Sequence, residues 1–186
     1  GKFNAVQAND WVMVSGSLTQ GVDVSFIRQL AEMVKEKQAR LVIDTSILSL
    51  EDYEVIKPYL IKPNLKELQL LFPDAAINLN NIEVYARKLL EVGIENVLLS
   101  LGNAGAYLFG KNASYQVVQP SVQEINTVGA GDAMLAAFVG SISIGMEVEE
   151  ALKRAAAAGA ATVSSIGLAE KEKIQQNMES IQVKRI

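Results

Sequence analysis

The sequence predicts an α/β fold built on a mostly parallel sheet. Short apolar runs, among them Trp11–Val14, Leu41–Ile43 and Val97–Leu99, alternate with segments of helical periodicity. Strands that are apolar at every position, rather than at every second one, are typical of parallel strands covered on both faces. The chain has 186 residues, of which 49% are hydrophobic and 20% charged, which is enough for the core of one globular domain. We therefore expect residues 1–186 to form a single α/β domain.

The first half of the chain supplies three predicted strands and two predicted helices. The run Trp11–Val14 is followed by a segment in which apolar residues from Phe26 to Val34 fall on one helix face. The strand Leu41–Ile43 comes next, and a short strand then ends at Lys62. Pro63 interrupts that strand, and Asn64 is a good first residue for a helix that carries Leu68 and Leu71.

The second half begins with a helix over 82–90, for which Gly93 is a suitable residue just beyond the end. The buried strand Val97–Leu99 follows it. The remaining predicted elements are an antiparallel hairpin of 106–109 with 115–118, a helix of small residues from about 133, helices over 148–164 and 170–178, and a last strand over 181–183.

Composition limits the chemistry. The chain contains no Cys and no His, so that acid–base work must fall to Asp or Glu. The net charge is −4 and Lys and Arg form no cluster, which argues against nucleic acid as a partner. No segment is long and apolar enough to span a bilayer, so we expect a cytoplasmic protein without a membrane partner.

Candidate functional residues follow the predicted strands. Ser15 and Gly16, Asp44, the segment 62–67 and the segment 100–105 each come directly after a strand. In parallel sheets ligands bind beyond the carboxyl ends of the strands. We therefore expect a binding site at that edge of the sheet.

The stretch Asn126–Asp132, with the letters NTVGAGD, runs into a helix of small residues. Glycines at a helix start let backbone N–H groups approach a phosphate, and the helix dipole favours negative charge there. Asp132 adds a carboxylate that can take a proton from an attacking hydroxyl, as phosphoryl transfer requires. The alternative is a Gly-rich turn whose Asp only complements the dipole.

Three other segments each allow two interpretations. Asn64 and Glu67 have the spacing of a capping box, and the same two side chains can hold Mg²⁺ and its waters; both roles are compatible. Lys62 can offer a positive charge to a phosphate or be an ordinary solvated residue. Asp44 can cap the following element or contact a substrate or metal. The segment Ser100–Gly105 is either a phosphate loop or a tight turn.

The GAGD turn and the helix that follows it resemble the C-terminal signature of the ribokinase/PfkB carbohydrate kinases. The resemblance implies a ribokinase-like three-layer fold, with Gly129, Ala130 and Gly131 as the anion hole and Asp132 as catalytic base. It also implies an ATP loop at Ser100–Gly105, comprising Ser100, Leu101, Gly102, Asn103, Ala104 and Gly105, with further nucleotide contacts at Gly131, Asp132, Lys62 and Asn64. The motif Asn64-x-x-Glu67 is similar to the family's Mg²⁺ motif.

Within that family the chain resembles the phosphosugar branch of 1-phosphofructokinases and tagatose-6-phosphate kinases. The loop Ser15–Gly21 is similar to the branch's sugar loop, although Thr19 stands where Pro is usual. The expected activity is ATP-dependent phosphorylation of a sugar phosphate. A kinase for an unphosphorylated sugar or nucleoside, and a non-catalytic nucleotide-binding module, remain as alternatives.

The resemblance covers only the C-terminal part of such a kinase. We therefore expect a fragment that lacks the N-terminal strands and the lid, binds nucleotide weakly and turns over little sugar by itself. An exposed sheet edge would also favour a homo-oligomer.

Overall fold

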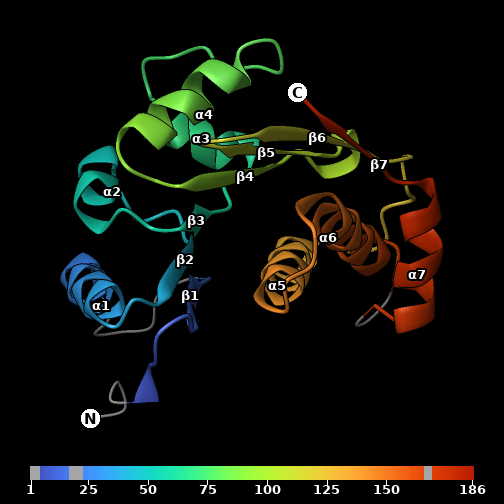
Figure 1. The fold of residues 1–186 in the computed structure, drawn as a ribbon. Coiled ribbons are helices and arrows are strands. Elements are labelled where there is room, and N and C mark those ends of the chain that lie inside the picture. The colour runs from blue at the N-terminus through green and yellow to red at the C-terminus, as the bar shows by residue number, and fades with distance from the viewer. Residues whose placement is uncertain (1–4, 17–22, 166–168) are drawn as a thin grey trace. The chain divides into compact units, whose positions relative to one another are not determined.

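The computed structural model describes residues 5–16, 23–165 and 169–186 (Figure 1). Its internal contacts divide the chain into two units. Unit 1 comprises Gly1–Leu99 with Phe109–Asn112, and unit 2 comprises Ser100–Leu108 with Ala113–Ile186. Each unit is described by itself below.

The strands of unit 1 form a parallel ladder in chain order. They are β1 (Trp11–Ser15), β2 (Arg40–Asp44), β3 (Leu60–Ile61) and β4 (Asn96–Ser100), and each pairs in parallel with the next. Parallel neighbours need a crossover between them, and each crossover here contains at least one helix. The predicted parallel arrangement of these strands is therefore confirmed.

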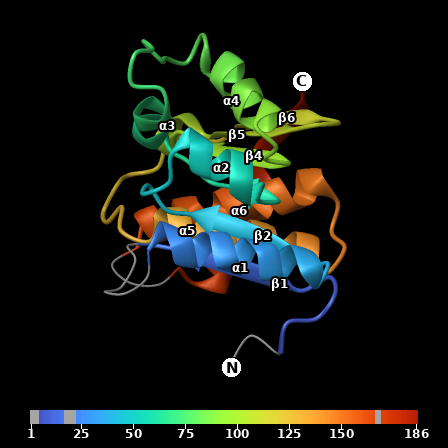
Figure 2. The same cartoon turned by 90° about the vertical axis from the view of Figure 1, so that its left-hand side faces the viewer.

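The crossover helices of unit 1 are α1 (Val24–Glu36), α2 (Leu50–Ile56), α3 (Leu65–Leu71) and α4 (Ile82–Glu91). Because the strands follow one another in order, right-handed crossovers all place their helices on the same face of the ladder. Figure 2 shows α1 and α2 in front of the strands they connect. An ion pair of 2.6 Å between Arg28 of α1 and Asp52 of α2 joins these two helices.

The centres of β2 and β4 are buried at three consecutive positions. Leu41, Val42 and Ile43 are at most 5% exposed, and Val97, Leu98 and Leu99 are fully buried. Three apolar neighbours in a strand point alternately to opposite faces. Both faces of these strands are thus shielded from water, which explains why the sequence shows runs rather than alternation.

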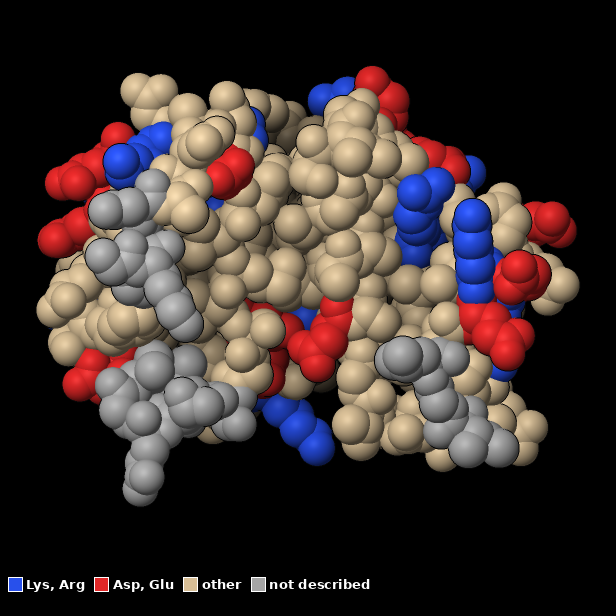
Figure 3. Space-filling view, turned by 90° about the horizontal axis from the view of Figure 1, so that it is seen from below, with Lys and Arg blue, Asp and Glu red and all other residues tan. Residues whose placement is uncertain are grey.

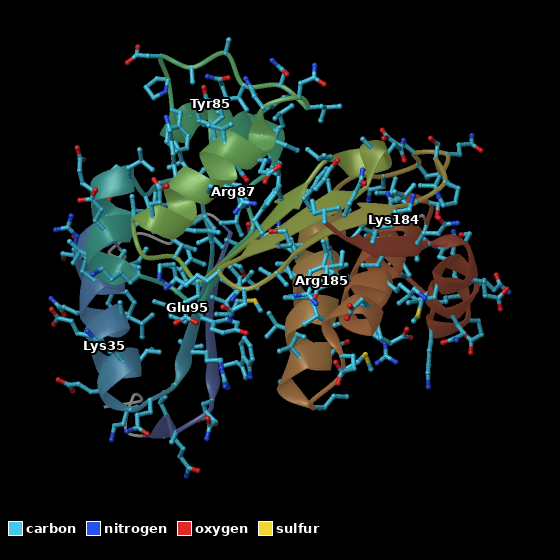
Figure 4. The ribbon with its side chains drawn as sticks, turned by 45° about the horizontal axis from the view of Figure 1, so that its top comes forward. Lys35, Tyr85, Arg87, Glu95, Lys184 and Arg185 are labelled. Atoms are coloured by element: carbon cyan, nitrogen blue, oxygen red, sulfur yellow. The ribbon has the colours of Figure 1, made fainter. Side chains whose placement is uncertain are left out.

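Unit 2 contains strands and three long helices. Its elements are β5 (Ala106–Gly110, the last residues of which belong to unit 1), β6 (Ser114–Val118), α5 (Ala130–Ser143), α6 (Val148–Val163), α7 (Lys171–Ser180) and β7 (Gln182–Arg185). Strand β7 pairs antiparallel with β6, and Figure 4 shows Lys184 and Arg185 on β7. Helix α6 packs against both α5 and α7 (Figure 1).

Small residues allow α6 to pack closely. The run Ala155–Ala161 is buried at every position, with Gly159 in its middle. A Cβ atom on Gly159 would lie 3.4 Å from the carbonyl oxygen of Ala130 and 3.6 Å from Cβ of Met134. This glycine therefore brings α6 against the first turns of α5, as the small-residue pattern indicates.

The structure contains one helix that the sequence patterns did not predict. Helix α2 is only seven residues long, and a full capping box starts it: Ser49 accepts a hydrogen bond from the N–H of Asp52, whose carboxylate accepts one from the N–H of Ser49. The Ser-x-x-Asp spacing was the available signal. Seven residues are too few for a clear helical period in hydrophobicity.

Candidate functional site

In unit 1, the ends of β2 and β3 bring two charged residues together. The parallel register pairs Ile43 with Ile61, so that the next residues, Asp44 and Lys62, lie side by side. Lys62 Nζ lies 3.2 Å from Asp44 Oδ1, and the two side chains are only 7% and 12% exposed. The sequence had suggested a solvated Lys62 as the alternative. The structure shows instead a largely buried ion pair, which is sustained only when both charges are present.

Asn64 and Glu67 form the predicted capping box at the start of α3. Asn64 Oδ1 accepts from the N–H of Glu67, and Glu67 Oε2 accepts from the N–H of Asn64, both at 2.9 Å. This confirms the structural interpretation of the motif. The second carboxylate oxygen of Glu67 makes no hydrogen bond among the described residues. That oxygen is therefore available for a further contact outside the capping box.

Asp44, Lys62 and Glu67 line one pocket of about 430 Å³ in unit 1. The pocket also contains Tyr53 from α2, which is 4% exposed. Burial raises the pKa of the Tyr53 hydroxyl, and the carboxylates of Glu67, Asp44 and Asp52 raise it further. The hydroxyl therefore stays protonated at neutral pH and can donate a hydrogen bond. Tyr53 was not among the predicted site residues because it lies on α2, the helix that the sequence patterns did not predict.

The segment Ser100–Gly105 of unit 2 is a tight turn. A 3₁₀ turn spans Gly102–Ala104, Leu101 N–H donates to the Gly105 carbonyl at 2.9 Å, and Gly105 N–H donates to that of Gly102 at 3.1 Å. Both glycines have positive φ, +56° at Gly102 and +90° at Gly105. The geometry agrees with the turn interpretation and is also one in which backbone can approach a phosphate.

Side chains fix this turn to the segment that follows β6. Asn103 Nδ2 donates to Glu124 Oε1 at 2.9 Å, and Asn103 Oδ1 accepts from the N–H of Val122. Gln119 Nε2 donates to the carbonyl of Gly102 at 3.1 Å. The side chain of Asn103 is thus engaged within the protein, so its expected contact with nucleotide would have to come from the backbone.

The motif before α5 starts that helix without a side-chain cap. Gly129 is the N-cap, with a left-handed φ of +78°, and the first helical hydrogen bond runs from Ala133 N–H to the Gly129 carbonyl at 2.8 Å. The Ala130 N–H reaches the Thr127 carbonyl only at 3.4 Å. The N–H groups of Gly131 and Asp132 donate to no group within the described residues. These donors are available to an anion.

Asp132 lies in the first turn of α5 and is exposed. Its carboxylate makes no ion pair or hydrogen bond with any residue that the structure describes. This position agrees with the interpretation in which Asp132 complements the helix dipole. It also leaves the carboxylate open beside unused N–H donors, as the phosphoryl-transfer interpretation requires.

Some predicted features give no further geometry. Ser15 ends β1 and Gly16 follows it, but residues 17–21 of the predicted sugar loop lie outside the described residues. Over the described ranges, no cluster of three or more acidic residues forms a metal site, and no helix is long and apolar enough to cross a membrane. On the face seen in Figure 3, the described Lys and Arg side chains lie among Asp and Glu rather than in one stripe.

The chain is similar to proteins of a known family. Residues 2–175 match the sequence model of the pfkB family carbohydrate kinases. The chain is 34% identical to a 1-phosphofructokinase of Bacillus subtilis, over 100% of this chain and 61% of the relative. It is 36% identical to a D-tagatose-1-phosphate kinase of Bacillus licheniformis, over 98% of this chain and 60% of the relative. The chain thus spans about 60% of the length of these curated relatives.

A solved structure has a similar fold. Phosphofructokinase-2 from Escherichia coli, crystallised with substrates and products, superposes with a TM-score of 0.85 at 27% identity. The superposition covers 96% of this chain and 59% of that one. The predicted ribokinase-like α/β fold class is therefore confirmed.

Proposed function

Because the chain belongs to the pfkB family of carbohydrate kinases, we propose that it is part of an enzyme that transfers a phosphoryl group from ATP to a hydroxyl of a sugar phosphate. The substrate would be of the fructose 1-phosphate or tagatose 6-phosphate type. The observation that carries the proposal is the N-terminus of α5, where open N–H groups and an unpaired carboxylate occur together. The names of the relatives support the phosphosugar class.

The start of α5 is the proposed anion hole. The N–H groups of Gly131 and Asp132 are open, and Gly129, Ala130 and Gly131 carry no side chain larger than a methyl group that would keep a phosphate away. The N-terminal end of the helix dipole favours the charge that spreads over the phosphoryl oxygens during transfer. The backbone of this turn would hold that group as it moves from ATP to the sugar.

Asp132 is the proposed base. Its carboxylate would accept the proton of the sugar hydroxyl while the hydroxyl oxygen forms a bond to the terminal phosphorus of ATP. The bond between that phosphorus and the bridging oxygen breaks, and ADP leaves with the electron pair. A carboxylate suits this task because the chain has no His. No described residue pairs with the Asp132 carboxylate, so its oxygens would be open to the hydroxyl.

The turn Ser100–Gly105 is the proposed nucleotide loop. Its two glycines adopt positive φ, and its hydrogen bonds to Gln119 and Glu124 hold it in place. Ser100, Gly102 and Gly105 would contact ATP, and the absence of side chains on the two glycines would let the nucleotide approach the turn closely. Leu101, Asn103 and Ala104 would complete the loop around them.

Mg²⁺ would be held near Asn64 and Glu67, with Lys62 offering its charge to a phosphate. The donor set fits: Mg²⁺ binds few protein oxygens and keeps several waters, and Glu67 retains one carboxylate oxygen outside the capping box. The bound ion would neutralise charge on the phosphate oxygens. The backbone N–H of Asn64 donates to Glu67 Oε2 and so orients the Glu67 carboxylate.

The test is ADP release with Mg-ATP and fructose 1-phosphate, fructose 6-phosphate, tagatose 6-phosphate or ribose, using the complete protein that contains this chain. Asp132→Asn should lower turnover by about 10²-fold or more, the value of a lost general base. Glu149→Gln is the matched control, since Glu149 is an exposed acid in the first turn of α6. Turnover of ribose alone would favour the kinase for unphosphorylated sugars. ATP binding without turnover on any sugar would favour a non-catalytic nucleotide-binding module.

A further inference from the structure

The last turn of α6 holds the segment that leads into α5. The carbonyl of Val163 accepts from the N–H groups of Ile125 and Asn126, at 2.9 and 3.0 Å. Asn126 Oδ1 in turn accepts from the N–H of Val128 at 3.0 Å, one residue before the Gly129 cap. A short series of hydrogen bonds thus connects the C-terminus of α6 to the N-terminus of α5.

The other carbonyls at this end of α6 are also satisfied. Ser164 donates to Ala160, and Ser165 donates to Ala161 and Thr162. The carbonyl of Ser164 accepts from the ammonium of Lys173 in α7, which also contacts Ser165 Oγ at 3.1 Å. Helix α6 has no basic residue in its own last turn. Lys173 therefore supplies from α7 the cation that the negative end of the α6 dipole favours.

We propose that Lys173 is a positioning residue for the anion site at the start of α5, acting through the last turn of α6. Its ammonium holds the carbonyl of Ser164, the residue that directly follows Val163 in the chain. Without the cation, the Ser164 carbonyl turns to water and the last turn of α6 loosens. The Val163 carbonyl then no longer fixes Ile125 and Asn126, and the Gly129–Asp132 turn loses its support. This role rests on the proposed function of that turn.

A neighbouring contact separates this role from simple docking of α7. Asn177 lies one helical turn after Lys173, on the same face, and its Nδ2 donates to the carbonyl of Ala157 at 3.4 Å. Both side chains thus attach α7 to α6. Only Lys173 reaches the end of α6 that holds the α5 segment, so Asn177→Leu is the matched control.

The direct test is amide hydrogen exchange in the chain as it stands. Lys173→Met keeps the aliphatic stem and removes the charge. We expect exchange of the Ile125 and Asn126 amides to accelerate by about tenfold or more in this variant, since a charge-assisted hydrogen bond is lost. Lys173→Arg should keep these amides protected, and Asn177→Leu should leave them unchanged. Equal exchange in wild type and Lys173→Met, or equal acceleration in Asn177→Leu, would overturn the proposal.

Binding of ATP, measured by calorimetry on the same proteins, connects the contact to function. Lys173→Met should bind Mg-ATP about tenfold more weakly than wild type, with Lys173→Arg close to wild type. Unchanged affinity in Lys173→Met would overturn the positioning role. Absence of ATP binding by the wild-type chain would count instead against the proposed function, and the exchange rates would still decide whether Lys173 orders the α5 segment.

Discussion

A Cβ atom on Gly105 would lie 2.1 Å from the carbonyl oxygen of Val117. The proposed nucleotide turn thus runs directly against the backbone of β6, and only glycine permits this approach. The backbone also has a φ of +90° at Gly105, a region that L residues with a side chain rarely adopt. Space and conformation impose the same choice of residue.

A left-handed conformation costs a residue with a Cβ roughly 1 to 2 kcal/mol. Gly105→Ala should lower the free energy of unfolding by several times that amount, because the added Cβ also collides with β6. Gly102→Ala is the control: its φ is also positive, at +56°, but no atom lies within 4 Å of the added Cβ. The free energy of unfolding, measured in urea, distinguishes the two. Equal losses would mean that β6 can move away from the turn.

The ion pair of Asp44 and Lys62 should matter more for stability than an exposed pair. Lys62→Met leaves a carboxylate that is 12% exposed without its cation, which costs about 3 kcal/mol or more in comparable proteins. Arg87 and Glu83 on α4 are 56% and 53% exposed, and Arg87 is labelled in Figure 4. Arg87→Met should cost less than about 1 kcal/mol. The double variant Asp44→Asn with Lys62→Met should recover part of the loss, and a small, equal loss in both single variants would contradict this ranking.

The capping box and the proposed Mg²⁺ role can be separated by two variants. Asn64→Ala removes a cap and should lower the unfolding free energy by about 1 kcal/mol. Glu67→Gln keeps an oxygen acceptor for the Asn64 N–H and loses only the charge. The free energy of unfolding of Glu67→Gln should change by less than about 1 kcal/mol. In the wild type, Mg-ATP should raise the melting temperature more than ATP with EDTA does, and this difference should disappear in Glu67→Gln.

Ser49→Ala is the control for that experiment, because it weakens the equivalent capping box of α2. It should lower stability as Asn64→Ala does, without changing the effect of Mg²⁺. If Glu67→Gln retains the full Mg²⁺-dependent protection, Glu67 has a structural role only.

The carboxyl group of Asp52 should contribute to stability by an amount that depends on pH. Its burial by itself raises the pKa, but hydrogen bonds from Ser49 and Arg28 outweigh burial and lower the pKa of Asp52 below the ordinary 3.8. A carboxyl group with a lowered pKa in the folded state stabilises fully above its unfolded pKa. This stabilisation is lost as the pH falls below 3.8 and through the lower pKa of the folded state.

The unfolding free energy of the wild type should therefore decrease more steeply below pH 3.8 than that of Asp52→Asn. Chemical denaturation between pH 2 and 6 measures the difference. Asp74→Asn serves as control, since Asp74 is exposed and has no ion pair or hydrogen bond among the described residues. Parallel curves for wild type and Asp52→Asn would show that the hydrogen bonds do not favour the charged form.

Most elements were predictable because their signals are local. The apolar runs gave β1, β2 and β4, and the helical period gave α1 and α4. Asn64 identified the start of α3 through the spacing of a capping box. The same spacing at Ser49 belonged to a helix too short to show a period, so α2 was missed. Tyr53, which lies on α2 and lines the pocket, was therefore missed as well.

The candidate site was predictable only as a set of residues. The sequence pointed to Gly129–Asp132, Ser100–Gly105, Asn64 and Glu67 because glycine turns and carboxylates in these patterns have a chemical use. It could not show that the side chain of Asn103 forms hydrogen bonds with Glu124 and Val122, or that Lys62 forms an ion pair with Asp44. Those contacts depend on side-chain directions in space.

The sequence by itself determined the order of the strands and of most helices, and it supplied the hypothesis of which residues handle a phosphate, because these patterns depend on neighbours along the chain. Only the tertiary structure decided which carbonyl Lys173 meets, why Gly105 must be glycine and where the Tyr53 ring lies. Each of these results from elements remote in sequence coming into contact, and a contact of that kind leaves no periodic signal in the chain.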